Sequence, residues 1–262
     1  MLFARFRHRG HESYGLLEGD RLRPLQGAPF GEHRIAGESL PLSEVTLLAP
    51  VRPGKILAAA VNYPSHVASS RPLVNLEQPP AVPQLFLKPP SAVIGPGEAI
   101  VLPAGAGRVD LEGELVAVIG RACRNVPAAE ALEYVFGYTC GNDVSARQWQ
   151  RDDLQWWRAK GADTFCPLGP FIATGLDPAN LELRTRLDGV EVQRTNTGAL
   201  VHGVAELVGF ASQSVGLEPG DVVFTGTAGE TPALRPGVVV EVDIQGIGVL
   251  RNPVVSGGGD KG

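Results

Sequence analysis

The chain has little cysteine and no long apolar run. Its three cysteines, Cys123, Cys140 and Cys166, are scattered and odd in number, so they do not form the even set of a disulfide framework. No stretch approaches the roughly 20 uncharged apolar residues that a membrane-spanning helix needs. The N-terminal sequence MLFAR lacks the apolar core of a signal peptide. These absences predict a soluble protein of the reducing cytoplasm, with no membrane partner.

Basic clusters are also missing. The chain has 23 Lys and Arg against 28 Asp and Glu, a formal net charge of −5, and no Lys/Arg-rich block that could follow a phosphate backbone. The sequence therefore argues against nucleic acid as a partner. Internal repeats and low-complexity tracts are absent too, although 33 glycines and 22 prolines indicate a chain rich in turns and short strands.

The length of 262 residues allows one large domain, or a main domain with a small appendage. Residues 2–25 read as short strands separated by turns at Gly10 and Gly19, and residues 27–43 form a link that contains glycine and proline. We therefore predict a small N-terminal β domain over residues 1–45 and a main domain over residues 46–262. The apolar run 55–61 is the first buried strand expected in the main domain.

Short helices are predicted over residues 127–137, 145–158 and 204–215. The first has a proline in its opening turn and ends at glycine, and the last has apolar residues at helical spacing. The second contains all three tryptophans, which we interpret as core or subunit-contact residues. Strands dominate from residue 171 onward and include a hairpin with its turn at Asp188 and Gly189.

Three acidic residues stand among apolar neighbours between residues 109 and 143. In an extended run VDLEGELVAVIG, Glu112 and Glu114 would project to the same side, with Asp143 as a third acid near them. Like charges in a partly dry site repel unless one is protonated or a cation lies between them. Carboxylate oxygens suit a hard ion such as Mg²⁺, Mn²⁺ or Ca²⁺. The alternative places both glutamates on the wet face of an edge strand and Asp143 at the cap of a helix beginning near Ser145.

A long segment without predicted structure runs from Asn62 to Pro83, and its part after His66 contains four prolines, at positions 72, 79, 80 and 83. A loop of this length inside a compact domain is typical of a lid over a functional site. His66 lies beside it and is a candidate catalytic residue, or alternatively a satisfied surface side chain. Lys160 has a similar alternative, a solvated lysine after the second helix.

Seven motifs in one order resemble those of the fumarylacetoacetate hydrolase family, over roughly residues 50–255. They are Asn62-Tyr63 with His66, KPPSA (88–92), LEGEL (111–115), GYTCGNDVSAR (137–147), DTFCPLGP (163–170), FTGT (224–227) and GIGVLRN (246–252). The resemblance implies an α+β, mostly β fold, in which a mixed β-roll of this family's C-terminal type forms the catalytic domain beside the small N-terminal β appendage. It also implies a homodimer.

The same resemblance implies a set of site residues. Mg²⁺ or a similar ion would be bound by Glu112, Glu114 and Asp143. Lys160 and His66 would be catalytic. The implied substrate contacts are Tyr63, Arg147, Gln150 and Thr227.

Substrates of such enzymes are 2-oxo acids or their enols, which can chelate the ion through the carboxylate and the oxo group. Hydrolytic members carry a glutamate three residues after the lid histidine, where this chain has Ser69, so water activation would need Glu77 to fold back. The residues after Thr227 also differ from the family's usual pattern of glycine and proline. The resemblance to the 2-hydroxyhepta-2,4-diene-1,7-dioate isomerase and 5-carboxymethyl-2-oxo-hex-3-ene-1,7-dioate decarboxylase branch therefore implies an isomerase or decarboxylase of 2-oxo dicarboxylic acids from aromatic-compound degradation.

Two alternatives stay open. Within the family, the chain could be an acylpyruvate or fumarylpyruvate hydrolase, or an oxaloacetate decarboxylase. Outside catalysis, it could be a silent relative that binds 2-oxo acids.

Overall fold

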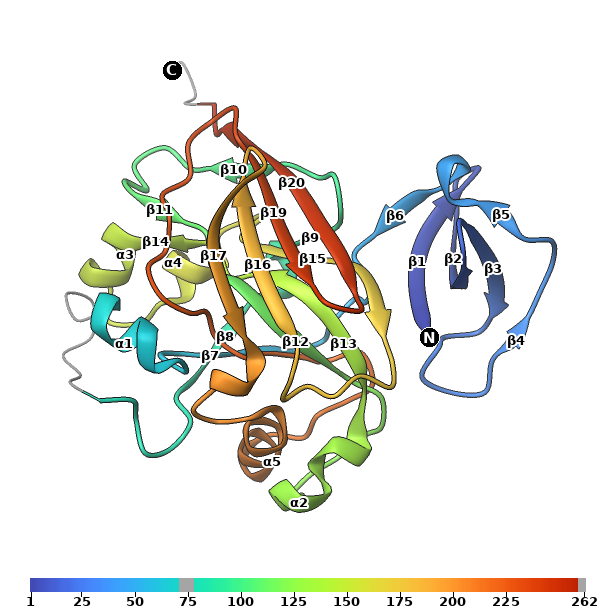
Figure 1. Ribbon diagram of the computed structural model, residues 1–262, viewed down its shortest axis with the longest axis horizontal. Helices are drawn as coiled ribbons and strands as arrows, with labels where there is room; N and C mark the ends of the chain where they lie inside the picture. The colour runs from blue at the N-terminus through green and yellow to red at the C-terminus, as the bar shows by residue number, and fades with distance from the viewer. Residues whose placement is uncertain (71–77, 259–262) are drawn as a thin grey trace.

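The computed structural model describes residues 1–70 and 78–258. A 13-stranded mixed sheet runs through it in the order β4-β3-β2-β1-β15-β13-β12-β18-β7-β8, with β5, β6 and β9 attached off this path (Figure 1). The strands are β1 (Leu2–His8), β2 (His11–Glu18), β3 (Arg21–Gln26), β4 (Arg34–Ile35), β5 (Leu40–Pro41), β6 (Thr46–Leu48), β7 (Ile56–Ala59), β8 (Leu85–Lys88), β9 (Val93–Ile94), β12 (Gly113–Ile119), β13 (Val135–Asn142), β15 (Cys166–Ala173) and β18 (Val222–Phe224). The predominance of strands confirms the mostly β class.

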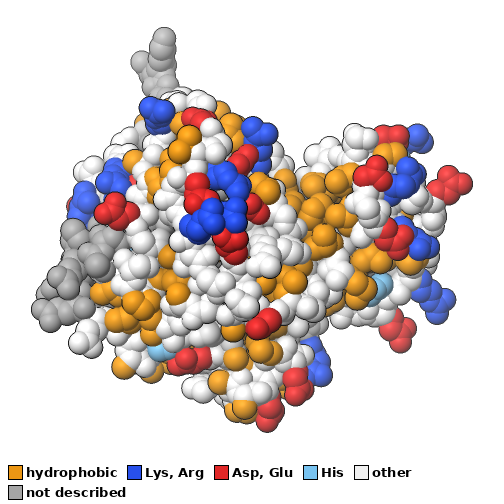
Figure 2. Space-filling view, in the orientation of Figure 1, with side chains coloured by type: hydrophobic (Ala, Val, Ile, Leu, Met, Phe, Trp, Pro, Cys, Tyr) orange, Lys and Arg blue, Asp and Glu red, His pale blue; other side chains and the backbone are white. Residues whose placement is uncertain are grey.

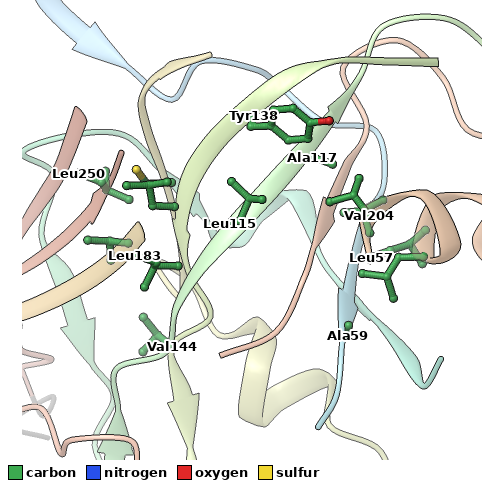
Figure 3. Packing of buried hydrophobic residues seen from close by; sticks show 14 of the residues in the cluster. Leu57, Ala59, Leu115, Ala117, Tyr138, Val144, Leu183, Val204 and Leu250 are labelled. Atoms are coloured by element: carbon green, nitrogen blue, oxygen red, sulfur yellow. The ribbon is translucent and has the colours of Figure 1, made fainter. Parts of the chain in front are cut away.

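A second, five-stranded sheet has the order β10-β20-β19-β16-β17, and β11 pairs with β14 in a short ribbon. These strands are β10 (Ile100–Leu102), β11 (Val109–Asp110), β14 (Ser145–Ala146), β16 (Glu182–Leu187), β17 (Val190–Asn196), β19 (Val239–Ile244) and β20 (Gly248–Ser256). The main core lies where the two sheets and α5 (Val204–Ser214) face one another, with Leu115, Tyr138, Leu183 and Val204 among its members (Figure 3).

Glycine allows the two sheets to approach closely at Gly113. A Cβ atom on this residue would lie 2.2 Å from Thr185 Cγ2 on β16, which is too close for any side chain. The residue between the two glutamates therefore has to be glycine, because β12 packs directly on the second sheet there.

The remaining helices are short: α1 (Pro64–Ser70), α2 (Ala128–Ala131), α3 (Arg147–Asp152) and α4 (Trp157–Gly161), with 3₁₀ turns η1 (Leu42–Glu44), η2 (Pro90–Ala92), η3 (Leu132–Tyr134) and η4 (Thr197–Ala199). Over the described residues, no helix is long and apolar enough to cross a membrane.

Four local expectations were wrong. The helix predicted over 127–137 ends at Tyr134, because β13 begins at Val135. The helix predicted over 145–158 is a strand followed by two short helices, since Ser145 pairs in β14 with Asp110 of β11. The extended run 109–120 is interrupted between β11 and β12, at residues 111–112. The segment 62–83 is not structureless at its start, because α1 occupies residues 64–70.

The N-terminal strands form the right-hand part of Figure 1 and join the main body through two pairings. β6 pairs with β1, and β1 pairs with β15 at Leu2–Ala173 and Phe3–Ile172. The large sheet is therefore continuous across residue 45. The division into domains at that residue stays a prediction.

Candidate metal-binding active site

Three buried carboxylates converge where β12 and β13 meet. Glu112, Glu114 and Asp143 each offer an oxygen that lies within 4.8 Å of the others, and each residue is at most 3% exposed. The antiparallel pairing of Gly113 with Asn142 places the three side by side, since each acid is adjacent to one member of that pair. The wet-edge alternative is wrong, because β12 lies between β13 and β18. The cap alternative for Asp143 is also wrong, because Ala146 is the N-cap of α3.

Lysine and arginine side chains balance two of these carboxylates. Lys160 Nζ donates to Glu112 Oε2 and to Asp143 Oδ2, each at 2.5 Å. Lys88 Nζ donates to Asp143 Oδ1 at 2.5 Å, and Arg147 donates to Glu112 Oε1. Lys160 belongs to α4 and is 3% exposed, so its interpretation as a solvated lysine is wrong. Charged residues at this density in a dry interior require such close pairing.

Glu114 has no comparable balance. Over the described part of the chain it forms no salt bridge, and its Oε2 accepts a hydrogen bond from Gly226 N at 2.6 Å. Burial and the neighbouring charges of Asp143 and Glu112 raise the pKa of Glu114 well above its usual value. Burial also raises the pKa of Glu112, but the charges of Arg147 and Lys160 outweigh this and hold it well below its usual range.

The residues present fit a divalent cation. All three donors are carboxylate oxygens, which hard ions prefer, and the uncompensated charge of Glu114 is the one that a cation would balance. Tyr63 Oη and Asn142 Nδ2 are buried polar atoms without a hydrogen-bond partner among the described residues. Tyr63 lies close enough to Glu114 for that carboxylate to affect its pKa, which burial chiefly raises. Buried polar atoms of this kind are usually satisfied by ordered water.

A small cavity opens onto the carboxylates. His66, Arg147, Gln150, Lys160 and Thr227 line it together with Glu112 and Glu114, so the structure brings together all but two of the residues expected at the site. Asp143 lies behind Lys160, and Tyr63 is buried beside Glu114 without lining the cavity. The other lining residues are apolar: Ala59, Ala60, Val61, Phe86 and Trp156.

His66 on α1 is held in one orientation. Its Nδ1 lies 2.7 Å from the carbonyl oxygen of Gly229. Because a carbonyl can only accept, Nδ1 carries the proton, and in the neutral ring Nε2 is the basic nitrogen. Nε2 lies 3.9 Å from Glu112 Oε1. Burial lowers the pKa of His66, against the opposing effect of Glu112.

The loop after Thr227 is fixed by a residue that sequence reasoning missed. Gln193 Nε2, from β17, donates to the carbonyl oxygens of Ala228 at 2.8 Å and Glu230 at 3.0 Å. Thr185 donates to Gln193 Oε1 at 2.9 Å and so orients the amide. No motif contains Gln193, because its contacts are far away in the sequence.

Asp110 and Lys88 were also missed as contributors. Asp110 accepts from Arg147 Nε and from Thr231 Oγ1, each at 2.8 Å, and thereby links the loop to the residue that holds Glu112. Lys88 begins the motif KPPSA, and its place in that motif is the sequence signal for it. The side chain of Ser69 and all of Glu77 lie outside the described residues.

The chain matches known families over nearly its whole length. Residues 55–255 match the family model described as "Fumarylacetoacetate (FAA) hydrolase C-terminal", and residues 1–50 match "Rv2993c-like, N-terminal". Protein Rv2993c of Mycobacterium tuberculosis is 47% identical over 239 residues, covering 90% of this chain and 88% of that protein. The match to the family's C-terminal domain confirms the fold class predicted from the motifs, a mostly β fold of this family's C-terminal type.

Solved structures of two isomerases resemble the chain over nearly its whole length. 5-Carboxymethyl-2-hydroxymuconate delta-isomerase from Mycobacterium smegmatis has a TM-score of 0.91 and 45% identity, covering 98% of this chain and 100% of that one. 2-Hydroxyhepta-2,4-diene-1,7-dioate isomerase from Mycobacterium marinum also has a TM-score of 0.91, with 41% identity over 99% of this chain and 100% of its own.

Other relatives are named for other activities. Oxaloacetate tautomerase FAHD2A of Bos taurus is 41% identical, over 82% of this chain and 71% of that protein. Maleylpyruvate hydrolase from Sphingobium sp. SYK-6, solved with manganese(II) and pyruvate, is 30% identical with a TM-score of 0.81, over 98% of this chain and 100% of its own.

Proposed function

Since the chain belongs to the fumarylacetoacetate hydrolase family, we propose that it is a divalent-metal-dependent isomerase or decarboxylase of 2-oxo (enol) dicarboxylic acids formed in aromatic-compound degradation. Isomerases are among its similar structures. The observation that carries the proposal is the convergence of Glu112, Glu114 and Asp143, with Lys160 and His66 in the same cavity. A homodimer and a cytoplasmic location stay predictions that rest on the resemblance and on composition.

The common step of these reactions is formation of an enolate next to a carboxylate. The chemistry that a bound Mg²⁺ or Mn²⁺ supplies is polarisation of the oxo group and stabilisation of the enolate charge. Lys160 adds a fixed positive charge beside that position, since its two ion pairs keep it protonated. Arg147 holds Glu112 in place through Oε1 while Asp110 holds Arg147.

His66 is positioned to move the proton. Its Nδ1 donates to the carbonyl oxygen of Gly229, so Nε2 is the atom that would accept a proton from the substrate carbon next to the oxo group. Nε2 would then return this proton to the substrate. Return to a different carbon gives a double-bond shift. Loss of CO₂ from a β-oxo acid leaves an enolate of the same kind. His66 Nε2 would take up a proton from solvent and transfer it to the carbon that lost CO₂.

A hydrolase is the second candidate, because a maleylpyruvate hydrolase shares the fold at 30% identity. Cleavage of a C–C bond needs an activated water, and Ser69 stands where hydrolytic members carry a glutamate. We expect Ser69→Glu to raise acylpyruvate cleavage by about 10²–10⁴-fold, the usual worth of general-base assistance, with metal affinity unchanged. Wild type that cleaves acylpyruvates at ordinary enzyme rates would favour the hydrolase instead.

The deciding experiment is proton exchange. Wild-type protein with Mg²⁺ should catalyse deuterium uptake from D₂O at the carbon next to the oxo group of 2-oxohexanedioate, followed by NMR. His66→Gln should abolish most of this exchange and keep metal binding, which calorimetry can measure. Exchange no faster than in buffer, together with normal ligand binding, would identify a silent binding protein.

A further inference from the structure

An uncharged groove lies beside the catalytic cavity. It has an empty volume of about 890 Å³ and is lined by Leu85, Phe86, Leu87, Leu154, Gln155, Trp156 and Trp157. These residues come from β8, from the segment that joins α3 to α4, and from the first residue of α4. None of the described lining residues carries a charge.

The groove and the cavity share a wall. Phe86 and Trp156 line both, and their rings pack edge to face with centroids 5.6 Å apart. Lys160 Nζ, which contacts Glu112 and Asp143, lies 5.1 Å from the centroid of the Phe86 ring. The aromatic pair therefore begins within one side-chain length of the carboxylates and leads outward into the groove.

The outer part of the groove exposes large apolar side chains to solvent. Trp157 is 66% exposed, Leu87 is 61% exposed, and Leu154 is fully exposed. Leu87 belongs to β8, which ends the path of the large sheet, and Leu154 and Trp157 line the same groove. A contiguous apolar surface beside an active site is typical of a ligand-binding groove.

The charges near the cavity are already engaged. Lys88, Lys160 and Arg147 each form salt bridges to the buried acids of the site. Because the described lining of the groove carries no charge, a second carboxylate on a chain lying in it would meet uncharged side chains there. Such a carboxylate would keep its hydration only by remaining in solvent.

We propose that this groove is the subsite for the distal carbon chain of the 2-oxo acid. It takes an extended apolar chain, preferably planar and unsaturated so that it stacks on Phe86 and Trp156, and leaves any distal carboxylate in solvent. This inference rests on the proposed function and sharpens it, because it selects long-chain substrates over four-carbon acids such as oxaloacetate.

The test is the binding of three 2-oxo acids to the Mg²⁺-loaded full chain, measured by calorimetry. Burial of a methylene strengthens binding by roughly fourfold, so 2-oxohexanoate should bind at least about tenfold more tightly than pyruvate. 2-Oxohexanedioate has the same chain with a distal carboxylate and should bind no more tightly than 2-oxohexanoate.

Variants at exposed positions of the groove separate this effect from damage to the site. Trp157→Ser and Leu154→Ser should each weaken the binding of 2-oxohexanoate by several-fold and leave the binding of pyruvate unchanged. Val190→Ser on β17 is the matched control, because Val190 is likewise 66% exposed but lies on the other sheet. It should change neither affinity.

Each outcome decides between the possibilities. Failure of wild type to bind any of the three acids would reject the proposed function itself. Pyruvate binding without dependence on chain length would overturn the subsite and leave the function standing. A change in molecular mass of Trp157→Ser by sedimentation, with the chain-length dependence intact, would identify the groove as a contact between copies of the chain and would also overturn the subsite.

Discussion

Two groups of ion pairs in this molecule use the same residue types in opposite environments. The first, buried beside the catalytic cavity, joins Lys88, Lys160 and Arg147 to the site carboxylates, and their side chains are at most 5% exposed. The second lies on the five-stranded sheet, where Figure 2 shows blue and red side chains gathered over β16, β17 and β19. It consists of Arg184, Arg186, Arg194, Glu182, Glu191, Glu241 and Asp243.

The difference in burial decides how much each ion pair contributes to the stability of the fold. The surface pairs lie in water, where the net stabilisation of an ion pair is about 0–1 kcal/mol. The buried pairs are held where the loss of one partner leaves a desolvated charge, at a cost of about 3–5 kcal/mol. The buried group also includes Glu114, which lacks a cationic partner among the described residues. A buried carboxylate without a cationic partner does not stabilise the fold, so we expect it to serve binding and catalysis.

The largest expected effect comes from Glu114→Gln. The variant should lose activity by more than about 100-fold, above the range seen for residues that merely support a metal ligand. The metal-free variant should nevertheless be more stable than wild type. The pKa of Glu114 is raised in the folded protein, so above the unfolded pKa near 4.5 its charged form disfavours folding.

Thermal unfolding in excess chelator at neutral pH measures this stability difference. Glu112→Gln is the matched control, because its charge is balanced by Arg147 and Lys160 and its loss should destabilise the fold. Equal shifts of the same sign in both variants would contradict the contrast between the two glutamates. Full wild-type activity in chelator, with no metal bound, would contradict the metal proposal.

Next in size is the replacement of one buried cation. Lys160→Met should lower the free energy of unfolding by about 3–5 kcal/mol, because Glu112 and Asp143 each lose an ion-pair partner in a dry site. Arg194→Met removes a cation of the surface group and should cost about 1 kcal/mol or less. Urea denaturation of both variants makes the comparison. Similar losses would mean that burial does not separate the two groups.

A smaller effect is expected at the loop after Thr227. Gln193→Leu leaves the carbonyl oxygens of Ala228 and Glu230 without their donor, at a cost of about 1–3 kcal/mol. The freed loop should raise KM for a 2-oxo acid more than it lowers kcat. Gln245→Leu, at an exposed amide, is the control and should change neither constant. A variant of normal stability and normal KM would exclude a positioning role for Gln193.

The smallest effect concerns Glu12 in the N-terminal strands. Its side chain accepts hydrogen bonds from Arg7 and Arg5 and pairs with Arg52, and these contacts lower the pKa of Glu12 from 4.5 to about 2. A lowered pKa stabilises the folded state above the unfolded pKa, and this contribution is lost as the pH falls from about 4.5 to about 2.

Wild type should therefore melt at a higher temperature than Glu12→Gln at neutral pH, and the two melting temperatures should converge as the pH approaches 2. Calorimetric melting across this range tests the expectation. A difference that persists unchanged at the lowest pH would assign the contribution of Glu12 to packing instead of charge.

The sequence by itself determined the family, the mostly β class and the three carboxylates. These follow from local patterns: Glu112 and Glu114 are separated by a single glycine, and Asp143 lies in the motif GYTCGNDVSAR. The short strands and α5 could be predicted for the same reason, because alternation and helical periodicity are properties of neighbouring residues.

The tertiary structure decided which side chains surround those carboxylates. Lys88 lies 55 residues from Asp143, and Arg147 lies 35 residues from Glu112, so no local pattern relates them. Pairing of Ser145 with Asp110 also made the start of the region predicted as one helix a strand, because a strand contact overrode local helical preference. Charge balance and loop position depend on distances in space. Folding alone brings Gln193 to the loop after Thr227, Asp110 to Arg147, and the aromatic pair Phe86 and Trp156 to the wall between the cavity and its neighbouring groove.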